Sequence, residues 1–99
     1  MSFSEVDIQK VWEKGTTVDN VDSSQWRKDQ LGAWIYRGYY GKRDNDYGWE
    51  IDHIRPVSDG GSDDIGNLRP LQWENNAYKQ DRNLTGPITS EGNKNIRKF

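Results

Sequence analysis

The chain contains no cysteine, and this absence constrains its fold more than any other single feature. Without thiols, neither a disulfide framework nor a thiolate zinc site can hold these 99 residues together. Only 31% of the residues are hydrophobic, yet the chain carries five Trp and five Tyr. We therefore expect one domain over residues 1–99, stabilised by a small core of aromatic rings.

Local signals predict both helices and strands, and thus a fold of the α+β class. Ser4 is suited to cap a helix over residues 4–14, and Gly15 to end it. Further along, the predicted order is a strand at 49–54, a turn-rich loop at 57–66, a second strand at 68–71 and an amphipathic helix at 73–82.

Three other segments give weaker signals. The end of the polar stretch 16–24 is expected to cap a turn that contains residues 26–28. Residues 33–40 are aromatic and fit either a short strand or an irregular packed segment. The last segment, 86–99, is polar and basic, and we expect it to be mobile or to lie along a ligand.

Charge is unevenly distributed along the chain. The formal net charge of −2 gives no support to a nucleic-acid partner. Residues 26–43, however, carry five cations against one acid, a local balance of +4, among several aromatic rings. Such a mixture can grip a nucleic-acid backbone and stack bases. The alternative is that the rings form the core, which we favour for Trp34 and Trp49.

No apolar run approaches the roughly 18 residues of a membrane span, and the first residues lack the character of a signal peptide. We therefore expect a cytoplasmic protein without a membrane partner.

The only histidine, His53, follows Asp52 at the end of a predicted strand. A lone His is more often structural than catalytic, so its surroundings decide its interpretation. The set consists of Asp52-His53-Ile54-x-Pro56, Gly60-Gly61, Asn67-Leu68-x-Pro70-Leu71 and Asn75-Asn76-x-x-Lys79. This ordered set resembles the HNH endonuclease family, in a cysteine-free His-Asn-Asn form. The resemblance extends over roughly residues 11–82. It implies a ββα-metal (His-Me finger) core at about 47–82, in a bacterial or phage-encoded protein.

The resemblance also implies a role for each motif residue. His53 matches the general base that takes a proton from the attacking water. Asp52 matches the carboxylate that binds a divalent metal. Asn67 matches the middle Asn, which orders the long loop and holds His53 in place. Asn76 matches the last metal ligand, and its neighbour Asn75 remains open as the alternative.

The implied metal ligands are all hard oxygen donors, which suit Mg²⁺ better than Zn²⁺, with Mn²⁺ or Ni²⁺ as further candidates. A structural zinc is not expected. The implied partner is DNA, whose phosphates need nearby cations. Alternation along the strand makes Glu50 a partner for a surface Arg. Candidates for phosphate contacts, each equally suited to a solvated surface role, are Arg55, Lys79, Arg82, Arg37, Lys42 and Arg43.

A metal-dependent DNA endonuclease is thus the leading hypothesis. A catalytically silent HNH-fold DNA-binding module is the alternative, although the intact motif residues argue against it. A protein-interaction domain is favoured only by the acidic net charge. A chain this short has little surface for recognising a long DNA site. We therefore expect low intrinsic sequence specificity, or specificity supplied by a homodimer or a larger partner.

Overall fold

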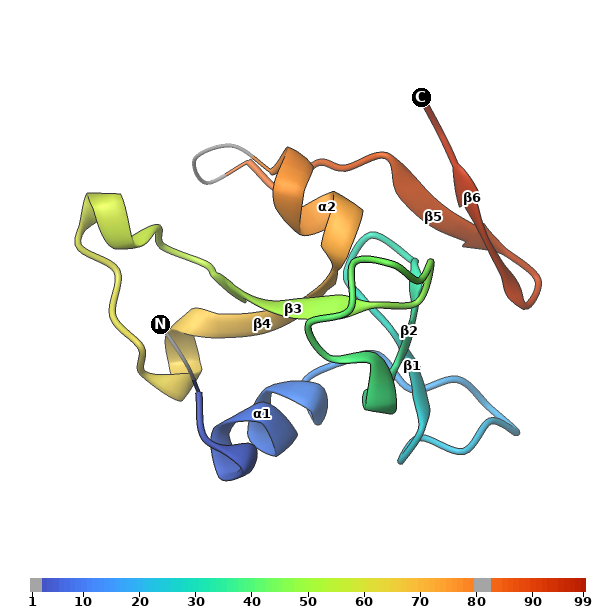
Figure 1. The fold of residues 1–99 in the computed structure, drawn as a ribbon, viewed down its shortest axis with the longest axis horizontal. Helices are drawn as coiled ribbons and strands as arrows, with labels where there is room; N and C mark the ends of the chain where they lie inside the picture. Colours follow the sequence, from blue (N-terminus) through green and yellow to red (C-terminus); the bar gives the residue numbers. More distant parts are fainter. Residues whose placement is uncertain (1–2, 80–82) are drawn as a thin grey trace.

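The computed structural model describes residues 3–79 and 83–99. An antiparallel hairpin lies at its centre, formed by β3 (Trp49–His53) and β4 (Leu68–Gln72). Helix α1 (Glu5–Trp12) covers one face of this hairpin, and α2 (Trp73–Tyr78) lies on the other face (Figure 1). The predicted α+β fold is confirmed, with β3, β4 and α2 as its ββα core.

Helix α1 begins where the sequence predicts. The Ser4 hydroxyl accepts a hydrogen bond from the backbone N–H of Asp7 at 3.1 Å, which satisfies one free donor of the first turn. Ile8, Val11 and Trp12 then fall on one face and are buried. This apolar stripe holds α1 against the hairpin.

Helix α2 follows β4 directly because Gln72 caps it. The Gln72 side-chain oxygen accepts hydrogen bonds from the backbone N–H groups of Glu74 and Asn75. The helix is shorter than predicted, since the backbone of Lys79 is already extended, with ψ of 133°. The predicted remainder, residues 80–82, lies outside the described residues. In the described part of the chain, no helix is long and apolar enough to cross a membrane.

Aromatic packing forms the core, as predicted. The rings of Trp12 and Trp49 are fully buried with centroids 5.3 Å apart, and Tyr40 packs on Trp49 at 5.0 Å. Each buried indole N–H donates to a backbone carbonyl, that of Trp12 to Ser23 at 3.0 Å. Trp34 and Trp49 therefore belong to the packed interior, as we favoured.

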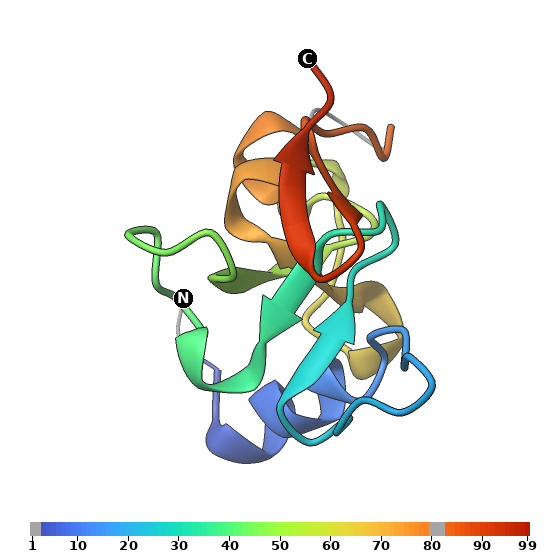
Figure 2. The same ribbon diagram turned by 90° about the vertical axis from the view of Figure 1, so that its right-hand side faces the viewer.

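The expected turn over residues 26–28 is instead a strand. β1 (Trp26–Lys28) pairs antiparallel with β2 (Trp34–Tyr36), seen in the foreground of Figure 2. Strands of three residues show too little alternation to be detected in a sequence. After β2 the aromatic segment becomes a short 3₁₀ turn at Arg37–Tyr39, so both interpretations of residues 33–40 were partly right.

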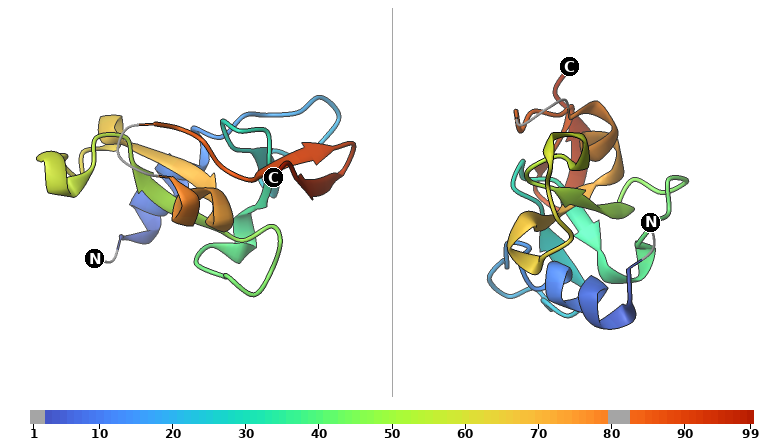
Figure 3. Two further views of the ribbon diagram at one scale, coloured as in Figure 1. Left: turned by 90° about the horizontal axis from the view of Figure 1, so that it is seen from above. Right: turned by 90° about the vertical axis from the view of Figure 1, so that its left-hand side faces the viewer.

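The expectation of a mobile basic tail is wrong for residues 88–97, which form the hairpin of β5 (Ile88–Glu91) and β6 (Lys94–Arg97). The Asn95 side chain fixes this hairpin to β2, because it accepts from the Trp34 N–H and donates to the Trp34 carbonyl oxygen. The hairpin lies at the opposite end of the molecule from the loop between β3 and β4 (Figures 1 and 3).

Candidate active site

Alternate residues of β3 point to opposite faces of the central hairpin. Ile51 packs into the core under α1, whereas Glu50 and Asp52 face α2. The strand register is continuous through Asp52 and His53, so the two side chains leave β3 on opposite sides. One ammonium group, that of Lys79, bonds both the Asp52 carboxylate and the backbone carbonyl oxygen of His53, so it reaches His53 through its backbone and not through its imidazole.

Asp52 is the most enclosed of the predicted site residues. Arg69, directly opposite on β4, donates from Nε to Asp52 Oδ2 at 2.8 Å. Lys79 donates from Nζ to Oδ1 at 2.9 Å. The side chains of all three residues are at most 10% exposed. Two cations therefore share one buried carboxylate. Sequence reasoning missed Arg69, whose facing position follows only from the strand register.

Asn76 lies beside β3, against Glu50 rather than Asp52. Its amide nitrogen donates to Glu50 Oε1 at 2.8 Å. Glu50 also receives two hydrogen bonds from Arg43, at 2.7 and 2.8 Å, which confirms the predicted pairing with a surface Arg. Burial favours the neutral form of Glu50, but the hydrogen bonds from Arg43 and Asn76 and the Arg43 charge outweigh it, so the pKa of Glu50 is lowered.

The neighbouring amide, Asn75, has a structural role. It is fully buried, donates to Asp29 Oδ2 and to the carbonyl oxygen of Ile88, and accepts from the Ile88 N–H. It thereby ties α2 to the start of β5. Burial raises the pKa of Asp29, although four hydrogen bonds to its carboxylate oppose the shift. Of the two amides, Asn76 is the one that borders the Glu50 and Asp52 side of β3.

His53 lies on the opposite side of the hairpin end. Its ring is tilted against Phe3, with centroids 6.1 Å apart, and its side chain is 19% exposed. The ring Nε2 lies 2.6 Å from Oδ1 of Asp63, which sequence reasoning did not single out. The only local signal was that Asp63 belongs to the acidic, turn-rich loop that follows the histidine.

Asn67 orders that loop, as the resemblance implies. Its Oδ1 accepts from the backbone N–H of Arg55 at 2.8 Å, and its Nδ2 donates to the carbonyl oxygens of Arg55 and Ser62. One amide thus clamps the first and the later part of the loop together. These bonds reach the residues around His53 and not the imidazole itself.

Two of the cations proposed for phosphate contacts are engaged by the protein itself. Lys79 is buried on Asp52, as described above. The Arg37 guanidinium donates to Gln9 Oε1 at 3.0 Å and lies 3.6 Å from Glu5 Oε2, so it fastens α1 to the end of β2. Both are therefore poorly placed to meet DNA without rearrangement.

Three of the other proposed cations, which lie in the described part of the chain, are more open. Lys42 and Arg55 are exposed. The Arg43 side chain remains 55% exposed while paired with Glu50. Arg55 lies two residues after His53, and its Nε donates to the carbonyl oxygen of Asp59. Arg82 lies outside the described residues.

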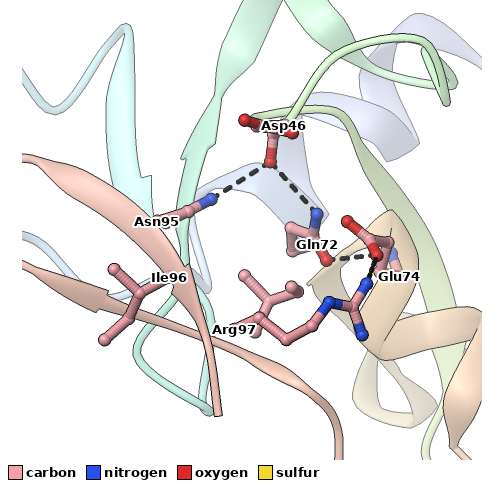
Figure 4. A pocket seen from close by; sticks show the side chains of 7 residues that line it. Asp46, Gln72, Glu74, Asn95, Ile96 and Arg97 are labelled. Atoms are coloured by element: carbon pink, nitrogen blue, oxygen red, sulfur yellow. Dashed lines mark hydrogen bonds and ion pairs between the residues drawn. The ribbon is translucent and has the colours of Figure 1, made fainter. Parts of the chain in front are cut away.

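A pocket of about 290 Å³ opens elsewhere, between α2 and the C-terminal hairpin. Figure 4 shows Gln72 and Asn95 both donating to the Asp46 carbonyl oxygen in its wall, and Arg97 paired with Glu74. Gln72 pairs with Trp49, at the other end of β3 from His53, about 13 Å along the strand. This pocket is thus separate from the predicted catalytic residue His53.

Comparison with known proteins finds one family similar to the central part of the chain. Residues 40–82 match the model of the HNH endonuclease family, a stretch that contains β3, the loop, β4 and α2. Over these residues the chain is similar to the HNH endonuclease family, as the motifs predicted. The match begins at residue 40, later than the resemblance we drew from residue 11. No curated protein and no solved structure matches the chain.

The HNH family implies a divalent metal. The oxygen atoms of Asp52 and Asn76, beside α2, are chemically suitable ligands for such an ion. Asp52 offers carboxylate oxygens and Asn76 an amide oxygen, the hard ligands that Mg²⁺ prefers. Within residues 3–79 and 83–99, no three His, Asp or Glu side chains gather closely enough to hold a metal ion. Water and substrate phosphate must therefore complete any coordination. Both Asp52 oxygens already accept from a cation, so a metal on Asp52 competes with Lys79 and Arg69.

Proposed function

We propose that this protein is a metal-dependent HNH endonuclease that hydrolyses phosphodiester bonds of DNA. The observation that carries the proposal is the family match over residues 40–82, which coincides with the ββα core and contains His53, Asp52, Asn67 and Asn76 in the expected order. The geometry supports it: His53 stands partly exposed at the end of β3, beside a loop held by Asn67.

In the proposed reaction, His53 accepts a proton from a water molecule as that water attacks the phosphorus atom in line with the leaving oxygen. The bond from phosphorus to the 3′ oxygen breaks, and the products carry a 5′-phosphate and a 3′-hydroxyl. Asp52 and Asn76 are the proposed ligands of the divalent metal, Mg²⁺ foremost. When bound, the metal supplies positive charge that stabilises the leaving oxygen.

DNA is the proposed partner, and the exposed cations near the site are its proposed phosphate contacts. Arg55 adjoins the loop beside His53, while Lys42 and Arg43 precede β3. Their contacts are sequence-independent, so the chain alone is expected to cut with low specificity.

The silent DNA-binding module remains as a second candidate, favoured by one observation. Asp52 is already neutralised by Lys79 and Arg69, which leaves little negative charge to attract a metal. If this arrangement is permanent, the fold binds DNA without cutting it.

Supercoiled plasmid distinguishes the two candidates. The protein is stripped of metals with EDTA and assayed with Mg²⁺, Mn²⁺ or Ni²⁺, and DNA binding is followed in parallel by mobility shift. The endonuclease predicts nicked or linear products that require an added ion and carry 5′-phosphate ends. Retarded DNA that stays supercoiled with every ion would instead establish the silent module.

A further inference from the structure

The loop between β3 and β4 brings a carboxylate to the histidine. Asp63 Oδ1 lies 2.6 Å from His53 Nε2, a short contact between groups ten residues apart. The Asp63 side chain is 42% exposed, and that of His53 is 19% exposed. The pair is thus reachable from solvent, while the other described acids of β3, Glu50 and Asp52, are engaged on the opposite face with Arg43, Arg69 and Lys79.

The position of Asp63 is built by its neighbours. Asn67 Nδ2 donates to the carbonyl oxygen of Ser62 at 2.7 Å, and Ser62 directly precedes Asp63. The same amide is bonded to the backbone of Arg55, two residues after His53. One side chain therefore fixes the backbone on both sides of the His53–Asp63 contact.

Gly61 allows the loop to close in this way. A Cβ atom at Gly61 would lie 1.7 Å from the carbonyl oxygen of Arg55, where no side chain fits. Gly60, just before it, has a φ of 85°, in the left-handed region that favours glycine. The Gly60-Gly61 pair of the motif thus folds the loop back onto Arg55 and carries Asp63 to the histidine.

An ionised carboxylate can only accept hydrogen bonds, so the ring nitrogen that faces it carries the proton. In a neutral imidazole the other nitrogen, Nδ1, is then left with its lone pair. We propose that Asp63 is a positioning residue for His53: it holds Nε2–H and leaves Nδ1 as the atom that takes the proton from water. The carboxylate also faces the positive imidazolium that forms when Nδ1 is protonated. This inference rests on the proposed endonuclease function.

A histidine-selective NMR experiment tests the contact, because His53 is the only histidine of the chain. In the metal-free protein we expect a downfield Nε2–H proton that exchanges slowly with water. Asp63→Ala should lose this signal, and Asp63→Asn should retain part of it, because the Asn oxygen can still accept. Asp64→Ala is the matched control, since it removes an exposed acid from the same loop and should leave the signal unchanged.

Plasmid nicking tests the consequence. Asp63→Ala should lower kcat by about tenfold or more with little change in KM, Asp63→Asn should lie between it and wild type, and Asp64→Ala should match wild type. Equal kcat for wild type and Asp63→Ala, or an unchanged ring N–H signal in Asp63→Ala, overturns the positioning role alone. A wild-type protein that shows the ring N–H signal can still leave the plasmid uncut with Mg²⁺, Mn²⁺ and Ni²⁺ alike. That result refutes the endonuclease function, and the positioning role with it.

Discussion

Lys79 Nζ lies 2.9 Å from Asp52 Oδ1 and 2.8 Å from the carbonyl oxygen of His53. Its side chain is only 6% exposed, so this ammonium is a resident cation at the proposed metal-binding carboxylate. A divalent ion must compete with it, because both charges seek the same oxygen.

Replacing Lys79 by Gln should therefore tighten the binding of Mn²⁺ by the metal-free protein. We expect a gain of roughly fivefold, equivalent to about 1 kcal/mol, measured by isothermal titration calorimetry. Lys98→Gln is the control, because it removes one exposed positive charge at the far end of the chain. Unchanged or weaker binding by Lys79→Gln, or an equal gain in both variants, would contradict the competition.

The backbone of the loop between β3 and β4 provides a test of how Asp63 is brought to His53. Gly61→Ala should destabilise the protein by about 1–3 kcal/mol in urea unfolding, because its Cβ would overlap the Arg55 carbonyl oxygen. It should also remove the slowly exchanging ring proton of His53, since the loop can no longer carry Asp63 to the ring. Gly66→Ala is the control in the same loop, with no atom within 4 Å of the added carbon. Similar effects in both variants would show that the close approach of Gly61 to the Arg55 carbonyl oxygen is not required for the loop to fold.

Asp29 connects three parts of the fold. Its buried carboxylate accepts from the backbone N–H groups of Leu31, Ala33 and Gln72 and from the Asn75 amide. Asp29→Ala leaves these donors without an acceptor and should reduce the free energy of unfolding by about 2–4 kcal/mol. The exposed Asp19→Ala should change it by less than about 0.5 kcal/mol. A neutral Asp29→Ala would exclude this connecting role.

The pKa of Glu50 is lowered from its ordinary value of 4.5, so its ionised form is stabilised by folding. That stability is fully present above about pH 4.5 and is lost as the pH falls through the folded pKa. Glu50→Gln should thus be less stable than wild type at pH 7, and the difference in the free energy of unfolding should close as the pH falls below 4.5 and through the folded pKa. Urea titrations at several pH values measure the gap, with the exposed Glu91→Gln as control. A gap independent of pH would contradict the Arg43–Glu50 pairing.

The ββα core could be predicted from the sequence because the signals that mark its elements are local. Pro56 ends β3, Gly60-Gly61 turns the loop, and Asn67 introduces β4 within a few residues. Ser4 likewise marks the start of α1 through a bond to a residue three positions on. Such signals remain readable without any knowledge of distant contacts.

What could not be predicted depends on contacts between distant residues. Arg69 reaches Asp52 across 17 residues only because of the strand register, and Asn76 rather than Asn75 meets β3 only because of how α2 docks. The C-terminal hairpin had one local signal, Gly92-Asn93, a pair suited to a two-residue turn. Its polar composition concealed that signal, and its attachment to Trp34 is 61 residues distant.

The central claim, that His53 is the base of a metal-dependent nuclease, is tested most directly by the rate of plasmid nicking by His53→Ala in Mg²⁺. Circular dichroism and urea unfolding first establish that the variant is folded. We predict that the wild-type protein nicks supercoiled DNA and that nicking by His53→Ala falls by about 100-fold or more, while DNA binding is retained. Nicking by folded His53→Ala at the wild-type rate would contradict the account.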